Sequence, residues 1–467
     1  MKKKLLILML PVAVFSKTVD FETALNLTIE NYQELKAKQL EVESTKMEAD
    51  EADSYNYGTF AINETVSNTN NAMYVFGMKL GAREATFGDF GFGEFINGMD
   101  TITPTSPTYD GGKSLLATEP DDLNNPGSRT NVETKFTYDV PLFVGYKLEN
   151  GKTMATLQGM AKEAKYKYDQ KNLGLKVLQA YNGAVTAKRF IALTKKGKAK
   201  AKSFIDTATD MYNKRLTRII DVKQAKMAYK SIDTKLKEAE SNYEVAIAYL
   251  RFLTGDETIT DVGDFKTAQC SITTLSELQK KALENRDDLD WMEYNVQTME
   301  KKIAYDTSDK YPTIGAHAEY GYNDDQFTVS SDKSYYLVAV GLTFNIFDGG
   351  LTKVKKEKAQ LDYLKTKTYQ DLMKNGIRLE VEKSFLEFKT KEQTLKEKIE
   401  TGKMSEEILD ETVEIYKNNL GFRTNMMYLL MSLQSMMTAQ ADAIMSEYEK
   451  SIAAAELHLA LGKSLNN

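Results

Sequence analysis

The sequence predicts a mainly α fold with a smaller transmembrane β part, built from one structural unit that occurs twice. Two observations lead to this fold class. The seven prolines lie at positions 11, 104, 107, 120, 126, 141 and 312, which leaves 142–311 and 313–467 free of the residue that most strongly breaks helices. Two blocks in the first half of the chain also align with blocks in the second half, so each half is expected to hold the same helices and strands.

The internal duplication sets the order of the elements. Residues 20–60 align with 274–314 at an offset of 254, and residues 136–222 align with 340–426 at an offset of 204. Because the second alignment needs no gap, the helical part is expected to have one length in both copies. The offsets differ by 50, so the first copy carries about 50 extra residues within 61–135.

Residues 1–16 are predicted to form a secretory signal peptide, because three lysines precede an apolar run that ends at small residues. The chain is therefore expected to be exported. No other stretch approaches the roughly 18 apolar residues of a transmembrane helix, so a membrane-crossing part is expected to consist of strands. Removing the three lysines leaves 58 basic against 67 acidic residues, which argues against nucleic acid as a partner.

The predicted domain boundaries follow the duplication. The first repeat is expected to span 17–255, with a helix, strands that flank a long extracellular insertion at about 67–131, and a helical hairpin at 147–255. A linker is expected at 256–273. The second repeat, 274–467, is expected to contain a helix, strands at 311–322 and 335–346, and a helical hairpin at 350–462. Residues 74–100 of the insertion are rich in Phe and Gly, and 101–131 hold four prolines with Asp, Asn and Ser, a composition that suits a surface loop.

Each predicted hairpin has two antiparallel helical arms of unequal length. The longer arm of the first hairpin, 147–213, would extend roughly 100 Å at ~1.5 Å per residue. Apolar residues in the second hairpin recur mainly every three, four or seven positions, at Ile377, Val381, Phe385, Phe388, Leu395 and Ile399. This pattern indicates coiled-coil packing, and an ordinary amphipathic core stripe would have the same spacing. The shorter arms precede Gly255 and Gly462, and glycine commonly ends a helix.

Stretches with a period of two predict the strands. In 336–346 the even-numbered residues are apolar and those between them are small or polar, and 314–322 and 136–142 alternate in a similar way. Such alternation suits a strand that crosses an outer membrane with one face toward lipid, although a half-buried strand in a soluble sandwich would alternate too. With 60–66, four strands are expected per chain. Four are too few to close a barrel, so closure would need other chains.

No motif predicts an enzyme. Residues 112–114 imitate the end of a phosphate-binding loop, but the required first glycine would fall at Pro107. The two histidines, His317 and His458, are too far apart for a local metal motif and have no nucleophile pattern nearby. Methionines cluster on the last helix, where we expect packing rather than binding of a soft metal such as Cu(I), at Met426, Met427, Met431, Met436, Met437 and Met445. No catalytic residue, cofactor or metal site is therefore predicted.

Four segments resemble the TolC family of outer-membrane efflux channels. They are the strand-to-helix junctions VPLFVGYKL and FNIFDGGLTK, and the helix-tip segments YNKRLTRIIDVKQA and YKNNLGFRTNMMYLL. The segment 74–131 also looks like an insertion that some members carry. Together with the duplication, the resemblance covers essentially the whole mature chain.

The resemblance implies a TolC-like homotrimer in the outer membrane of a Gram-negative bacterium. Twelve strands would form a transmembrane β-barrel, and twelve helices would continue it as an α-barrel, a periplasmic tunnel. The implied function is that of a passive exit duct for drugs, toxic compounds or metals in a tripartite efflux system. The implied partners are a periplasmic adaptor (membrane fusion) protein and an inner-membrane transporter of the resistance-nodulation-division (RND) or ABC type. A channel for type I protein secretion and a non-transporting periplasmic coiled-coil protein are the alternatives.

The resemblance also assigns residues at the helix tips. Contacts with the adaptor are expected at Lys214, Arg215, Leu216 and Thr217, and at Asn419, Leu420, Gly421 and Phe422. Arg215 and Asn419 replace a glycine that the family's tips usually carry. Some members of the family have an acidic constriction just after the second tip. At the matching positions this chain has Asn425 and Tyr428, and the first copy has Asp221 and Gln224.

Two expectations follow for the gate at these tips. Asn425 carries no charge, so we expect weaker block by multivalent cations than acidic members show. Arg218 and Arg423 are expected to hold the closed state by pairing with carboxylates such as Asp221 and Glu414 on neighbouring helices.

Overall fold

The computed structural model describes residues 17–268, 274–418 and 425–465. The predicted signal peptide, 1–16, lies outside the described residues. The chain divides into two compact units. The helical unit comprises the described residues up to 46, within 157–297 and from 364 onward, and the strand unit comprises 47–156 and 298–363.

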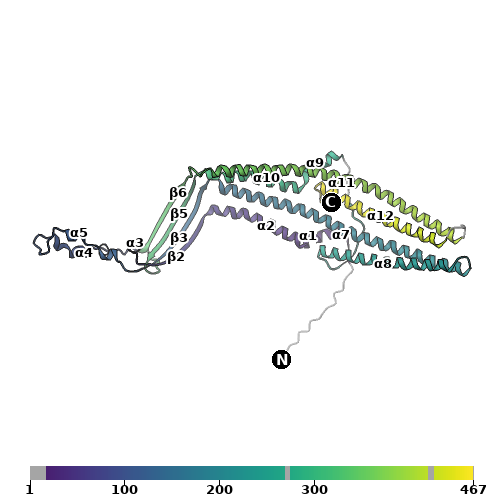
Figure 1. Cartoon of the computed structure of the whole chain (residues 1–467), viewed down its shortest axis with the longest axis horizontal. Coiled ribbons are helices and arrows are strands. Elements are labelled where there is room, and N and C mark those ends of the chain that lie inside the picture. The colour runs from purple at the N-terminus through teal and green to yellow at the C-terminus, as the bar shows by residue number, and fades with distance from the viewer. Residues whose placement is uncertain (1–16, 269–273, 419–424, 466–467) are drawn as a thin grey trace, which may run out of the picture. The chain divides into compact units, whose positions relative to one another are not determined.

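The strand unit is built around one antiparallel sheet of four strands in the order β2-β3-β5-β6 (Figure 1). The strands are β2 (Thr59–Thr69), β3 (Arg129–Val144), β5 (Thr313–Asp324) and β6 (Ser334–Thr343). Each repeat contributes two of them, and β3 of the first repeat pairs with β5 of the second. The four strands that the alternation predicts are therefore present, and together they form one sheet.

The two strands of the second repeat have different ends from those predicted. β5 begins at Thr313, because the Tyr311 backbone N–H still closes a short turn on the Ser308 carbonyl at 3.0 Å. β6 ends at Thr343 and not at 346. The Asp348 carboxylate accepts hydrogen bonds from the backbone N–H groups of Gly350 (2.9 Å) and Thr352 (2.8 Å), which turns the chain into the helix that follows.

The insertion of the first repeat is folded and is not a bare loop. It contains α3 (Ala72–Gly81), α4 (Phe92–Asn97), α5 (Lys113–Ala117) and α6 (Asp121–Asn124). The Asn71 side chain caps α3 by accepting a hydrogen bond from the Met73 backbone N–H at 3.1 Å. Val75 and Ala82 are fully buried, so α3 packs tightly although composition alone indicated a loop.

Ion pairs anchor the end of α3 to the sheet. The Glu84 carboxylate lies 2.5 Å from both Arg129, at the start of β3, and Lys333, just before β6. The hydrogen bond from Lys333, opposed by burial and supported by the hydrogen bond from Arg129, lowers the pKa of Glu84 to about 2. The insertion is thus tied to strands of both repeats.

The helical unit is built from the long helices of the two repeats. α7 (Lys147–Asn213) and α11 (Leu351–Lys417) each have 67 residues, as the alignment without a gap predicts. The return helices α8 (Ile219–Thr254) and α12 (Met426–Ala460) have 36 and 35 residues. Within the described part of the chain, every helix is too short or too polar to cross a membrane.

Each repeat begins with a short helix followed by a longer one. These are α1 (Phe21–Asn31) and α2 (Gln33–Ser54) in the first repeat, and α9 (Leu275–Asn285) and α10 (Asp287–Asp306) in the second. Side chains cap both short helices: Asp20 accepts from the Thr23 N–H at 2.8 Å, and Thr274 from the Glu277 N–H at 3.4 Å. Because such caps satisfy otherwise unpaired N–H groups, they define where the helices start.

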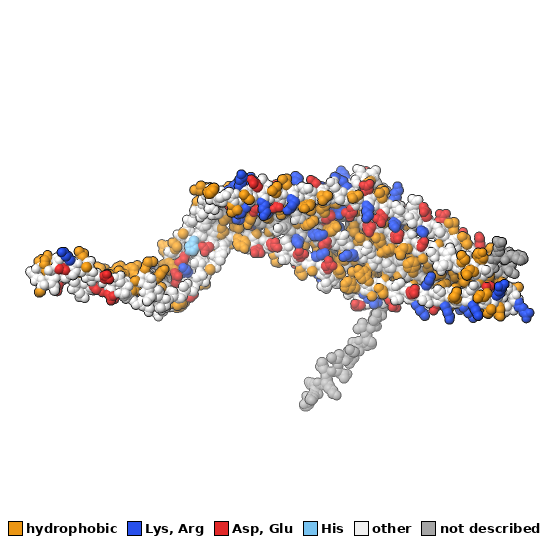
Figure 2. Space-filling view, in the orientation of Figure 1, with side chains coloured by type: hydrophobic (Ala, Val, Ile, Leu, Met, Phe, Trp, Pro, Cys, Tyr) orange, Lys and Arg blue, Asp and Glu red, His pale blue; other side chains and the backbone are white. Residues whose placement is uncertain are grey.

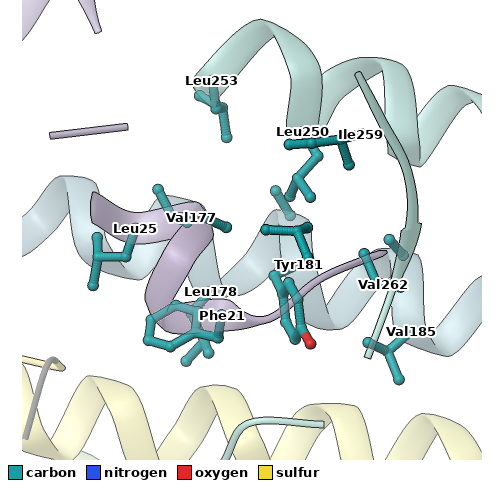
Figure 3. Close-up of a cluster of buried hydrophobic side chains, with 14 of the residues drawn as sticks. Phe21, Leu25, Val177, Leu178, Tyr181, Val185, Leu250, Leu253, Ile259 and Val262 are labelled. Carbon is teal, nitrogen blue, oxygen red and sulfur yellow. The ribbon is translucent and has the colours of Figure 1, made fainter. Parts of the chain in front are cut away.

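A second, smaller sheet lies in the helical unit and was not predicted. β1 (Lys17–Val19) pairs in parallel with β4 (Ile259–Val262), which lies in the segment expected to be a linker. Ile259 and Val262 are fully buried beside Tyr181 of α7 and Leu250 of α8 (Figure 3). The short strands therefore tie the start of the chain to the first hairpin.

Candidate functional site

The four-stranded sheet has one apolar and one polar face. Residues paired across neighbouring strands lie on the same face of a sheet. The pairing aligns apolar side chains in two adjacent rows, Ile62, Phe136, Tyr320 and Tyr336, and then Phe60, Tyr138, Ala318 and Val338. This face is open, since Tyr336 is 80% exposed and Val338 is 70% exposed. An exposed apolar surface of this kind indicates contact with lipid or with another protein.

Both edges of this sheet are open within the described chain. β2 and β6 are the outer strands, and each pairs on one side only. An edge strand presents a row of unpaired backbone N–H and C=O groups. In lipid, these groups must be satisfied by another strand.

At the helix tips, the two hairpins share one hydrophobic core. It contains Phe204 and Met211 of α7, Val222 of α8, Leu409 and Tyr416 of α11, and Met426, Leu429 and Met436 of α12. Met426 and Met436 are fully buried. Two of the predicted packing methionines thus lie in the core, whereas Met427, Met431 and Met445 are exposed.

The turn of the first hairpin presents the predicted adaptor residues. Lys214, Arg215 and Leu216 are exposed, and Thr217 is half-buried. Arg215 has a positive φ of 62°, and the Leu216 N–H closes the turn on the Met211 carbonyl at 2.8 Å. Arg215 thus adopts the left-handed conformation that favours glycine, at a cost of about 1–2 kcal/mol.

Asp221 lies in the first turn of α8. Its carboxylate accepts a hydrogen bond from the Thr217 hydroxyl. Tyr416, at the end of α11, is only 4% exposed. Burial raises the pKa of Tyr416, the hydroxyl of Thr217 lowers it, and the negative charge of Asp221 raises it further. The Tyr416 hydroxyl makes no hydrogen bond within the described chain, but it lies close enough to Thr217 and Asp221 for both to affect its pKa.

The predicted gate ion pairs are not formed within the described chain. Arg218 is exposed and has no ion pair among the described residues. Glu414 instead pairs with Lys417 on its own helix at 3.3 Å. Gln224 is half-buried on α8. The second tip, from Asn419 to Phe422, and Arg423 lie outside the described residues.

Asn425 begins the last long helix. Its side-chain oxygen accepts a hydrogen bond from the Tyr428 backbone N–H at 3.3 Å and caps α12. Tyr428 is 52% exposed. Among the residues that the structure describes, no group of His, Cys, Asp and Glu side chains is arranged to hold a metal ion.

Sequence reasoning did not single out Tyr416 as a functional residue. The available signal was its alignment with Tyr212, which places a tyrosine at the same helix end in both repeats. The two differ in the structure, because Tyr416 is buried whereas Tyr212 is 43% exposed. Only packing between the two hairpins distinguishes them.

The duplicated helical hairpins and the shared sheet form the fold of TolC-like outer-membrane channels. Residues 278–463 match the outer membrane efflux protein family. The resemblance drawn from the sequence is thereby confirmed for the second repeat. No curated protein sequence matches the chain.

Solved structures extend the similarity to nearly the whole chain. The chain is similar to CusC, a transmembrane channel, with a TM-score of 0.75 and 11% identity over 96% of this chain and 94% of CusC. It is similar to the Campylobacter jejuni CmeC outer membrane channel, with a TM-score of 0.73 and 13% identity over 95% and 85%. The open state of the Neisseria gonorrhoeae MtrE outer membrane channel gives a TM-score of 0.72 and 14% identity over 95% and 89%. At these identities the likeness shows the fold.

Proposed function

We propose that the chain is the outer-membrane channel of a tripartite efflux system, a passive exit duct for small molecules. The observation that carries this proposal is the four-stranded sheet with an exposed apolar face and two open edges, in a chain whose second repeat matches an efflux family. Lipid would cover the apolar face, and the opposite face would line the duct. The absence of a catalytic motif in the sequence fits a duct that performs no chemistry.

Three copies would satisfy the open edges. Pairing β2 of one copy with β6 of the next would join four strands from each copy into a closed ring of twelve. Closure of this kind removes every unpaired backbone group from lipid. Channels of the matched family are trimeric and work with efflux pump partners.

The helix tips would dock the periplasmic adaptor, which links the duct to an inner-membrane transporter of the RND or ABC type. Lys214, Arg215 and Leu216 support this assignment because they are exposed at the end of the first hairpin. Asn419, Leu420, Gly421 and Phe422 would complete the contact from the second hairpin. Adaptor docking would shift the tips from a closed to an open population.

Planar bilayers test the proposal. We expect the detergent-purified chain to be a trimer by native mass spectrometry and to produce single-channel current steps. A water-soluble monomer that leaves bilayers silent would contradict the duct and support the coiled-coil alternative. Deletion of the gene separates efflux from type I secretion, because loss of efflux raises susceptibility to drugs or metals whereas loss of secretion removes an exported protein.

The burial of Tyr416 in the core shared by the two hairpins would help to hold the tips closed, since it joins the two hairpins of one chain. We expect Tyr416→Phe to lower the ratio of open to closed channels about fivefold, because the buried hydroxyl has no hydrogen-bond partner and its removal would stabilise the packed tips by about 1 kcal/mol. Single-channel recordings measure this ratio directly.

Tyr212→Phe is the matched control for Tyr416→Phe. Tyr212 is the repeat counterpart of Tyr416 and is exposed, so its substitution is expected to leave the open probability unchanged. Equal open probabilities in the wild type and in both variants would remove Tyr416 from the gate. Arg218 and Arg423 would then remain as candidates, pairing with carboxylates such as Asp221 and Glu414 of neighbouring helices.

A further inference from the structure

The polar face of the sheet carries a compact group of titratable side chains. The strand-face cluster consists of residues from three strands: Glu133, Lys135 and Asp139 on β3, His317 and Glu319 on β5, and Tyr335 on β6. Figure 2 shows a histidine among acidic and basic side chains over the strands. Asp139 pairs with His317 across β3 and β5, so the cluster is centred on the two inner strands of the sheet.

His317 connects two carboxylates of the cluster. Its Nδ1 lies 2.7 Å from Asp139 Oδ1, and its Nε2 lies 3.5 Å from Glu319 Oε2. The residue opposite His317 on β6 is Ala339, which is uncharged. The charged groups that face the imidazole are therefore both negative.

The remaining members hold the other side of the cluster. The Tyr335 hydroxyl lies 2.8 Å from a carboxylate oxygen of Glu133 and 2.8 Å from one of Glu319. Lys135 Nζ lies 3.5 Å from Glu133 and 3.9 Å from Glu319. Only 15% of the Glu319 side chain is exposed, whereas 63% of Asp139 is exposed.

The charges of the cluster do not cancel. Three carboxylates stand against one lysine, so the cluster has a formal charge of −2 when His317 is neutral and −1 when it is protonated. The rim of the sheet is balanced, because Glu84 and Asp324 there face Arg129 and Lys333. The excess negative charge on this face therefore belongs to the cluster.

We propose that the strand-face cluster makes the strand part of the duct prefer cations over anions, and that protonation of His317 weakens this preference. The proposal rests on the proposed function, in which the polar face lines the duct. Three copies would place nine carboxylates and three lysines around one bore, and charge of one sign in a narrow passage raises the local concentration of the opposite ion. Protonation of three histidines would halve the net charge.

Reversal potentials across planar bilayers in a KCl gradient test the proposal. Salt near 0.1 M keeps screening moderate, since the Debye length is then about 10 Å. The wild type is expected to conduct K⁺ over Cl⁻ at pH 8 and to lose about half of this preference at pH 5. His317→Asn is expected to keep at pH 5 the preference that it has at pH 8. Glu319→Gln and Asp139→Asn are each expected to reduce the permeability ratio at pH 8 about twofold.

Glu64→Gln is the matched control, because Glu64 is exposed on β2 and pairs with Thr134, which places it on the apolar face. Its permeability ratio is expected to equal that of the wild type. If Glu319→Gln prevents folding, Asp139→Asn tests the same expected loss of cation preference. The Asp139 side chain is largely exposed, so its substitution is expected to leave folding intact. Conducting channels with one permeability ratio in the wild type, Glu319→Gln and Asp139→Asn would overturn the inference and leave the duct intact. A wild type without conductance would overturn both.

Discussion

Replacing Asn425 with Asp is expected to make the channel at least about tenfold more sensitive to block by a trivalent cation such as hexaamminecobalt. Asn425 caps α12 at the helix tip, and three copies of an Asp there would form a ring of carboxylates around the tunnel. Such a ring concentrates and traps multivalent cations. The neutral side chain of the wild type offers no such site, so its single-channel current should persist in micromolar blocker. Titration of the blocker during single-channel recording measures the effect.

Asn425→Ser separates charge from helix capping in this experiment. Serine, aspartate and asparagine cap helices about equally well, so α12 should start at the same residue in all three proteins. The serine variant is expected to be as insensitive to the blocker as the wild type. Block of the wild type by micromolar trivalent cation, or equal block of the Asp and Ser variants, would show that residue 425 does not line the constriction.

Replacing Arg286 with Met is expected to reduce the free energy of unfolding by about 3–5 kcal/mol, because removing one partner leaves a buried charge unpaired. Only 6% of the Arg286 side chain and 8% of the Asp288 side chain are exposed. The guanidinium contacts Asp288 through Nε at 2.9 Å and Nη2 at 2.7 Å, and Glu380 of α11 through Nη1 at 2.6 Å. Burial would lower the pKa of Arg286, but the two carboxylates raise it, so the group stays charged. Chemical denaturation followed by circular dichroism measures the loss.

Lys280→Met tests whether burial, and not the loss of a cation as such, causes this effect. Lys280 pairs with Glu284 at 4.0 Å, but 79% of its side chain is exposed, so the expected loss is less than about 1 kcal/mol. A double variant, Arg286→Met with Asp288→Leu, should recover part of the loss because no buried carboxylate then remains unpaired. Equal stabilities of the Arg286→Met and Lys280→Met variants would contradict the assigned role.

Much of the architecture was predictable because it depends on local patterns. The gap-free alignment predicts one length for the long helices, and α7 and α11 both have 67 residues. Alternation places Phe136, Tyr320 and Tyr336 on one face of the sheet, and the pairing of the strands does the same. The short strands β1 and β4 escaped prediction because each has only three or four residues and gains its stability from a partner more than 200 positions away.

Less of the candidate site was predictable. The exposure of Lys214, Arg215 and Leu216 agrees with their predicted place at a helix tip. The proximity of Tyr416 to Asp221 could not be predicted, because it depends on how the two hairpins pack against each other. The same holds for the strand-face cluster, in which Asp139 and His317 meet through the pairing of β3 with β5.

By itself, the sequence determined the type, length and repetition of the elements, since proline positions and apolar periodicity act within a few residues of each other. The tertiary structure decided which side chains of one repeat meet those of the other. The aligned residues Tyr32 and Arg286 illustrate the difference: Tyr32 remains half-buried, whereas Arg286 is buried between Asp288 and Glu380. Burial forces a charged group to find a partner, and only the packing of distant helices supplies it.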